Sequence, residues 1–266
     1  MFEYSSKLLL LAFVYLILFT LEYLIPYFNI RQHHLQHSIR NLSLALINSL
    51  TAVCLLVFIL IHVFDWTTRN NFGLLNILNL DQFASYIIAF ILLDLWQYIW
   101  HRLNHKVVFL WRFHQVHHAD KDMDASTGVR FHTVEIIFSS LTRILIIPIL
   151  GLELNQLILY EVILLPIILF HHSNINLNEN LDRILRIFIV TPHIHRLHHS
   201  DIKSETNSNY SSVFSIWDRI FSSYSMRSIE SGFRLGLGKQ FSSNEWNRLW
   251  GMIKMPFQKV PKYTPP

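Results

Sequence analysis

Long stretches without charged side chains constrain the fold of this chain more than any other feature. Residues 8–25 carry one charge, Glu22, near the end of the run, and residues 42–64 carry none. A helix of about 20 apolar residues crosses the roughly 30 Å hydrocarbon core of a bilayer. Both stretches therefore predict transmembrane helices. The first is longer than the apolar core of a secretory signal and no small-residue cleavage site follows it, which favours an uncleaved helix.

Three further apolar stretches contain polar side chains. Residues 83–100 are apolar except for Asp94 and Gln97, and they lead directly into His101. Residues 133–150 and 156–170 hold isolated charges and one proline each, and the sequence GLELN lies at their junction. Because a charge in hydrocarbon is costly, we expect a helical hairpin whose charged groups face protein or a water-filled cavity. The predicted fold is an all-α integral membrane helical bundle of about three transmembrane helices plus a membrane hairpin, and five full crossings fit the same pattern.

Histidines are concentrated in one part of the chain, where 12 of the 16 lie between residues 101 and 199. Residues three and four apart share one face of a helix, so each short cluster directs two or three imidazoles the same way. Imidazole is the commonest protein ligand of iron, copper and zinc. The eight histidines of the three main clusters exceed what one tetrahedral ion uses, which predicts two metal ions. These candidate ligands are His101, His105, His114, His117, His118, His195, His198 and His199.

Two other histidine positions adjoin the predicted hairpin. His132 lies directly before it, and His171 and His172 lie directly after it. Both ends of a closed hairpin return to one membrane face, so we expect His132 and one of the adjacent pair to join the clusters. Adjacent helical residues point about 100° apart, so one metal does not need both. The isolated histidines, which are His33, His34, His37 and His62, are interpreted as surface or satisfied core residues.

The distribution of Lys and Arg predicts the orientation of the bundle. Two lie between the first two predicted helices and one between the second and third, against five in residues 101–132 and twelve in residues 173–266. Such an excess marks the cytoplasmic side, which predicts a cytosolic histidine-rich cap. A basic surface attracted to anionic headgroups is compatible with this, and points to a bilayer rather than nucleic acid as partner. The single cysteine, Cys54, excludes a disulfide within the chain and a cysteine-based metal site.

One polar stripe and one aromatic segment complete the candidate site. Asp94, Tyr98, His101 and His105 follow a helical spacing of four, seven and eleven residues, so Asp94 is expected to orient Tyr98 or a histidine, or to make a helix-packing hydrogen bond. Residues 208–224, SNYSSVFSIWDRIFSSY, alternate aromatic and small polar side chains. They fit either a cap over the metal site, held to the histidines or their helix by Asp218 and Arg219, or an aromatic segment at the membrane interface.

The order HxxxH, HxxHH, RFHxxE, HHSN, TPxxHxxHH and NYxxxxSxWDRxFxxY over residues 88–224 resembles the sterol desaturase / fatty acid hydroxylase superfamily. The resemblance implies a catalytic domain over 83–224, between N-terminal transmembrane helices (1–82) and a C-terminal cytosolic tail (225–266). It implies a dinuclear iron centre held by the eight clustered histidines, by one of His171 and His172, and by His132. The chain departs from the family by carrying Ser211 and Ser222 where glycine is common, so those turns are expected to take conformations that serine tolerates.

The resemblance implies an oxidoreductase that hydroxylates or desaturates a lipid C–H bond, sterol-like or fatty-acyl, using O2. Each turnover needs two external electrons, and the sequence has no dinucleotide fingerprint or haem domain, so a separate reductase or electron carrier is expected. Iron is the expected metal, and zinc is the substitute expected on overexpression, because the order of affinities does not protect iron. Two other classes use similar residues: a zinc-dependent membrane hydrolase, which needs only three ligands and a base, and a metal transporter, whose ligands belong near mid-membrane.

Overall fold

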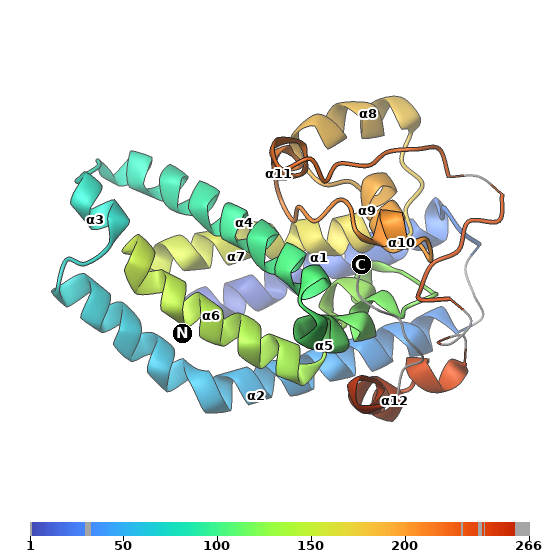
Figure 1. Ribbon diagram of the computed structural model, residues 1–266, viewed down its shortest axis with the longest axis horizontal. Coiled ribbons are helices and arrows are strands. Elements are labelled where there is room, and N and C mark those ends of the chain that lie inside the picture. The colour runs from blue at the N-terminus through green and yellow to red at the C-terminus, as the bar shows by residue number, and fades with distance from the viewer. Residues whose placement is uncertain (1, 30–32, 230, 239–240, 242, 259–266) are drawn as a thin grey trace.

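The computed structural model describes residues 2–29, 33–229, 231–238, 241 and 243–258, with side chains from residue 9 onward. Four segments are long and apolar enough to cross a membrane. They contain the helices α2 (His34–Arg69) with α3 (Leu74–Leu78), α4 (Gln82–Lys106), α6 (Thr133–Leu150) and α7 (Leu154–His172). Figure 1 shows the long helices side by side, with the short elements other than α3 gathered at one end. Because the described ranges contain helices and no named strand, the all-α prediction is confirmed.

The long helices begin and end where the local sequence favours it. The Asp81 carboxylate accepts a hydrogen bond from the backbone N–H of Ala84 (3.1 Å) and caps the start of α4. Gly151 ends α6 with a positive φ of 72°, a conformation that glycine adopts without strain. The expected hairpin is therefore formed by α6 and α7. A Cβ on Gly73 would lie 2.2 Å from the Gly151 nitrogen, so two glycines let α3 close the end of the bundle remote from the cap.

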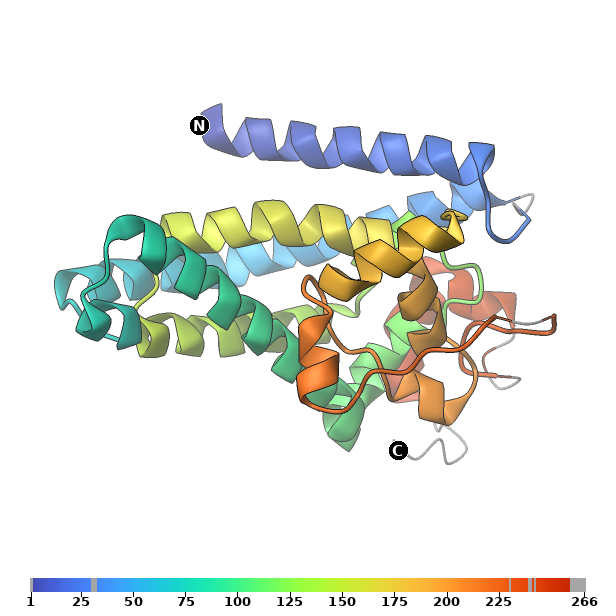
Figure 2. The same cartoon turned by 90° about the horizontal axis from the view of Figure 1, so that it is seen from above.

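Helix α1 (Phe2–Leu24) lies along one side of the bundle, next to α7 (Figure 2). Its described apolar part, Leu9–Leu24, is shorter than the four candidate spans, so the predicted first crossing stays a prediction. Leu18 packs with Leu169 and Ile175. Glu22, the charge noted in this stretch, accepts hydrogen bonds at 2.8 Å from the backbone nitrogens of Ala125 and Asn174. Glu22, the single charge in this apolar run, thus attaches α1 to the histidine-rich end of the structure.

The main core lies between the long helices. Leu93 of α4, Ile147 of α6, and Tyr160 and Leu164 of α7 belong to one buried cluster with Leu75 of α3. Tight packing of these side chains fixes how far the helices extend relative to one another. The polar ends of α4 and α7 consequently meet the start of α6 at the same end of the bundle.

The cap consists of short elements that carry or surround the histidines: α5 (Val108–His118), η1 (Ala125–Val129), α8 (Glu179–Phe188), α9 (Pro192–His198), α10 (Lys203–Thr206), α11 (Ile216–Ile220), η3 (Asn244–Asn247), α12 (Leu249–Lys254) and η4 (Met255–Phe257). Helix α8 exposes Leu181, Ile184, Ile187 and Phe188 while its charged residues form ion pairs. Such an amphipathic helix is suited to lie in the plane of a membrane interface.

The described part of the predicted C-terminal tail packs against the rest of the chain. Phe241, Met252 and Met255 are buried with Leu44 of α2 and Trp111 of α5. This segment therefore supports the helix that carries three of the histidines, although the predicted domain boundaries themselves remain predictions. Lys239 and the last eight residues lie outside the described residues.

Candidate metal centre

Four elements deliver the clustered histidines to one place. His101 and His105 lie in the last turns of α4, His172 is the last residue of α7, and α5 and α9 supply the remainder. Spacings of three and four residues bring the side chains of each helix onto one face. Since α4 and α7 both end at the cap, their terminal imidazoles meet those of α5 and α9. The same-face prediction for the clusters agrees with this arrangement.

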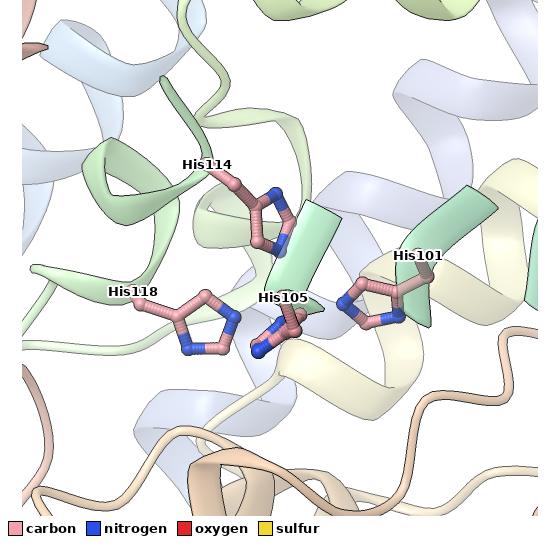
Figure 3. Close-up of side chains that lie close together, drawn as sticks. All are labelled: His101, His105, His114 and His118. Carbon is pink, nitrogen blue, oxygen red and sulfur yellow. The ribbon is translucent and has the colours of Figure 1, made fainter. Parts of the chain in front are cut away.

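The first group contains two histidines from α4 and two from α5. His101, His105, His114 and His118 each offer a ring nitrogen, and these four atoms lie within 4.8 Å of one another. Figure 3 shows the four side chains lying together, a pair from each helix. His198 of α9 adjoins this group, because its Nε2 lies 3.1 Å from the Nε2 of His101.

The second group joins residues far apart in the sequence. His117, His172, His195 and His199 again place one ring nitrogen each within 4.8 Å of the others. The Nε2 of His172 lies 3.1 Å from that of His117 and 2.9 Å from that of His195. His118 and His199, whose ring centroids are 4.4 Å apart, connect the two groups.

The protonation states of these imidazoles suit metal binding. Burial, and then the proximity of other histidines, holds the pKa of His117, His118 and His199 well below its usual range. Burial lowers the pKa of His198 to about 3. Near pH 7 these side chains are neutral, which is the form that binds a metal ion.

Unpaired ring nitrogens are a second indication, from geometry, that these histidines are suited to metal binding. Within the described residues, both ring nitrogens of His105, His118 and His199 are buried without a hydrogen-bond partner, as is the Nε2 of His114. A buried polar atom left unpaired costs roughly 1–3 kcal/mol, so such a concentration in a native protein calls for a ligand. Two groups of converging neutral nitrogens fit two metal ions.

The outward-facing Nδ1 atoms of several candidate ligands are anchored. The Nδ1 of His101 lies 2.8 Å from the Tyr210 carbonyl, and that of His198 lies 2.6 Å from the Ser208 carbonyl. A carbonyl only accepts, so each Nδ1 carries the proton and each Nε2 faces the centre with its lone pair. This is the usual way in which outer partners orient histidine ligands.

A carboxylate performs the same task for His114. Its Nδ1 donates to Glu135 Oε1 at 2.7 Å, and both side chains are buried. Glu135 was visible in the sequence as a charge in an apolar run but was not assigned to the site. The sequence signal that could have assigned Glu135 to the site is its position three residues after His132, in the first turn of the hairpin.

Two predicted ligands lie outside the metal-binding groups. His132 caps α6, where its Nδ1 accepts a hydrogen bond from the Val134 N–H (3.1 Å) and its ring packs beside Phe113, so its expected place among the ligands stays a prediction. Of the adjacent pair, only His172 enters a group. The His171 ring lies beside that of His195, with centroids 4.0 Å apart and ring planes tilted by 42°. The expectation that one metal needs only one of these neighbours stays a prediction, with His172 as the better placed of the two.

Asp94 does not contact Tyr98 as one alternative predicted. Its carboxylate accepts hydrogen bonds from the backbone N–H groups of Val213 and Phe214 and from the indole N–H of Trp217 (2.8 Å). Tyr160 donates to the same carboxylate at 3.2 Å. Asp94 thus fastens the segment 208–224 to the bundle, which corresponds to the packing alternative.

Tyr98 reaches the candidate centre indirectly. Its hydroxyl lies 2.8 Å from the Ser223 hydroxyl, which donates to Asp218. Asp218 accepts a hydrogen bond from the Tyr210 N–H at 2.8 Å, and the Tyr210 carbonyl holds His101. Asp218 therefore braces the loop rather than a histidine, as does Arg219, which donates to backbone carbonyls. The Tyr210 ring lies beside those of His101 and His198, with centroids 5.8 Å apart in both cases, so this part of residues 208–224 agrees with the cap alternative.

Ser222 is the exception among the turns of this cap. Its φ is +55°, in the left-handed region, so the expectation that serine tolerates the turn without strain is wrong for Ser222. Ser211 is not among the residues with positive φ, and there the expectation agrees with the structure.

A polar layer lies behind the second group. His37 lies between two carboxylates, with Nδ1 2.7 Å from Asp124 and Nε2 2.9 Å from Asp120. Burial by itself raises the pKa of Asp120, but the charges of His37 and then Arg130 outweigh it and hold that pKa well below its usual range. His34 contacts Asp124 and Glu22 at 3.2 Å. His37 is a satisfied core residue, as expected, whereas the Nδ1 of His34 is buried without a hydrogen-bond partner among the described residues.

A cavity of about 370 Å³ extends from the histidines into the bundle. The centre contributes His101, His114 and His172, among other histidines, to its wall, and residues of α2, α4, α6 and α7 form most of the rest. The arrangement brings buried metal-binding groups to the end of a cavity that lies between candidate membrane-spanning helices.

Comparison with known proteins identifies the family. The model of the fatty acid hydroxylase family matches residues 86–223, just over half of the chain. The chain belongs to the fatty acid hydroxylase family. The matched residues include the eight histidines of the two groups and the adjoining His198, and the resemblance recognised in the sequence is confirmed.

Curated relatives of this fatty acid hydroxylase family member are lipid-modifying enzymes by name. The chain is 28% identical to ornithine lipid hydroxylase of Rhizobium tropici over 52% of its length and 41% of the relative. It is 31% identical to human alkylglycerol monooxygenase over 61% of the chain and 35% of the relative. Human cholesterol 25-hydroxylase is 26% identical over 50% of the chain and 48% of the relative. The chain thus spans less than half of the length of these relatives, and no solved structure matches it.

Proposed function

We propose that this protein is a membrane-bound di-iron oxygenase that oxidises a C–H bond of a lipid with O2 and externally supplied electrons. The observation that carries the proposal is the pair of buried four-histidine groups at the end of a cavity between membrane-type helices. Membership of the fatty acid hydroxylase family supports it. The relatives named as hydroxylases and monooxygenases make hydroxylation the first reaction to test, with desaturation as the alternative outcome.

Each candidate group is assigned one iron ion. His101, His105, His114 and His118, with His198 adjoining, would hold the first, and His117, His172, His195 and His199 would hold the second. Bound iron would activate O2 for removal of hydrogen from an unactivated C–H bond. We keep zinc as a substitute that imidazole groups also accept.

The chain's own residues orient the ligands and shape the surroundings. Glu135 and the carbonyls of Tyr210 and Ser208 accept the Nδ1–H hydrogen bonds that keep Nε2 directed at the centre. Burial of the histidines keeps bulk water away from them. The cavity presents a long substrate to the centre from the membrane side, where a lipid is dissolved.

The proposal includes a cytosolic orientation of the cap and a separate reductase or electron carrier. The excess of Lys and Arg in the cap segments supports the orientation. Cysteine labelling tests it in a Cys54→Ser background: Ser204→Cys in the cap should react from the cytosolic side and Asn70→Cys, at the far end of α2, from the opposite side. Both positions are exposed. Labelling of both from one side would refute the predicted topology.

Metal analysis and isotope labelling together test the activity. Wild-type protein purified under iron-replete conditions should contain close to two metal ions per chain, and His198→Ala should contain less. In cells grown under heavy-isotope oxygen gas, a lipid should gain one labelled oxygen atom only with wild type. His62→Ala serves as the matched control, because His62 is exposed on α2 and bonds only to its own helix. If fully loaded wild type changes no lipid despite supplied electrons, the zinc hydrolase becomes the better assignment.

A further inference from the structure

The cavity that starts at the histidines is also lined by an ion pair that joins two candidate membrane-spanning helices, α6 and α7. Arg143 of α6 donates to Glu161 of α7 at 2.8 Å, and both side chains line the cavity. They are 24% and 42% exposed, so neither is buried against the protein. From this arrangement we propose that the pair binds a neutral hydrogen-bonding group of the lipid, and that oxidation occurs at a carbon far from that group. The inference deepens the proposed function and rests on it.

Helical spacing places the pair well away from the metal-binding groups. Arg143 follows Glu135, the partner of His114, by eight residues, and Glu161 precedes His172 by eleven. At 1.5 Å per residue these separations are about 12 Å and about 16 Å along the helix axes. The pair therefore lies near the middle of α6 and α7, within both candidate membrane spans.

The wall between the two ends is largely apolar. On α7, Leu165 and Ile168 lie four and seven residues beyond Glu161, which puts them on the face that leads to His172. Ile136 of α6 and Leu164 of α7 also line the cavity. The cavity thus has the ion pair at one end, an apolar wall in the middle and the histidines at the other end. This order matches a lipid whose hydrocarbon separates its polar group from the oxidised carbon.

The pair bridges α6 and α7 across the cavity and lies outside the apolar core. Helices α6 and α7 contribute Ile147, Leu157 and Leu164 to one buried cluster that they share with other helices. A charged side chain at the centre of a membrane helix costs about 2.5–3.5 kcal/mol on insertion scales, so such residues usually serve a function. Within the described residues, the Arg143 guanidinium makes this single hydrogen bond of the five it is able to donate. The remaining donors are available to a ligand in the cavity.

The charges of the pair indicate which ligand fits. A hydroxyl group is able to accept from Arg143 and donate to Glu161 at the same time, leaving the ion pair neutral. A carboxylate or phosphate would be repelled by Glu161, since like charges in a site of low dielectric strongly disfavour each other. A pure hydrocarbon would leave both residues without new partners. The expected ligand class is a long lipid with a neutral hydroxyl or amide group.

Binding measurements with three matched probes test this without turnover. Metal-loaded protein in lipid nanodiscs, without O2 or an electron donor, is titrated with octadecanol, stearate and octadecane in competition with a fluorescent lipid. Wild type should bind octadecanol best. Arg143→Gln should weaken octadecanol binding roughly tenfold, the size expected for loss of one hydrogen bond to a charged group. Arg183→Gln should change nothing, because Arg183 pairs with Glu179 on the exposed face of α8.

The variant Glu161→Gln separates recognition from a structural role. Removing the repelling charge should weaken octadecanol binding while strengthening stearate binding roughly tenfold, so the order of the two probes reverses. Equal loss of affinity for all three probes in both variants would show that the pair only supports the helices and would overturn the inference. Equal wild-type affinity for octadecanol and octadecane would also overturn it. If the alcohol is preferred but no lipid is oxidised in the labelling experiment, the binding inference stands and the oxygenase proposal fails.

Discussion

The hydrogen bond between Glu135 and His114 permits a quantitative test of how the centre is held. The carboxylate oxygen lies 2.7 Å from His114 Nδ1, and the two side chains are 5% and 2% exposed. Water therefore has little access to replace the carboxylate when it is removed. We predict that changes at Glu135 reduce metal affinity although Glu135 itself is not assigned as a ligand.

The expected size follows from the chemistry of the bond. Outer partners of histidine ligands typically contribute 10- to 100-fold to metal affinity, or about 1.4–2.7 kcal/mol. Glu135→Gln retains an oxygen acceptor but loses the charge, and charged hydrogen bonds are about twice as strong as neutral ones. We expect a loss of roughly tenfold for Glu135→Gln. Glu135→Ala leaves a buried N–H without an acceptor, so its loss should approach 100-fold.

Competition with a chelator measures this effect directly. Metal retained by purified protein is determined by mass spectrometry over a series of chelator concentrations, for wild type and both variants. Glu179→Gln is the control, because Glu179 is a fully solvated carboxylate of α8. If Glu135→Ala retains metal as well as wild type while His114→Ala does not, the reasoning that Glu135 orients His114 is refuted.

Three other changes give separate expectations. His172→Gln should lower metal content toward one ion per chain whereas His171→Gln should retain both, and equal loss in a metal assay would contradict the assignment of His172 alone. Ser222→Gly should raise stability by up to about 1 kcal/mol in thermal unfolding, because glycine avoids the roughly 1–2 kcal/mol cost of a left-handed residue and loses part of that gain to chain entropy; Ser211→Gly should give no gain. Asp94→Asn should weaken the attachment of residues 208–224 by about 1–3 kcal/mol, seen as faster proteolysis of the cap with metal retained, and unchanged proteolysis would argue against the anchoring role.

The candidate metal groups were largely predictable because their information is local. Spacings of three and four residues on a helix determine which imidazoles share a face, and this holds for His101, His105, His114 and His118 whatever the tertiary structure. The apolar runs likewise specified α2, α4 and the hairpin by length alone. Local patterns of this kind do not depend on how distant segments meet.

Sequence patterns were least informative where distant segments meet. His132 satisfies a helix N-terminus that the sequence does not distinguish from a metal site. Asp94 shares a helical face with Tyr98, yet its hydrogen-bond partners are Tyr160 of α7 and residues 213–217, the latter over a hundred positions away. The choice of Glu135 as partner of His114 depends on how α5 packs on the start of α6. Sequence spacing specifies which residues share a helical face, but not which residues of other elements contact that face.

The two histidine groups differ in how much chain must be ordered to form them. The four histidines of the first lie within residues 101–118, and only the adjoining His198 is added later, whereas the second combines residues from 117 to 199 and is incomplete until the last of these has been synthesised. Loop-closure entropy grows with the logarithm of length, so a closed loop about five times longer costs about 1.4 kcal/mol more, or roughly a tenfold lower population before packing contributes. During biosynthesis the α4–α5 site is therefore the first able to capture an ion. When metal is scarce, protein molecules should accumulate with that site filled and the other awaiting its ion.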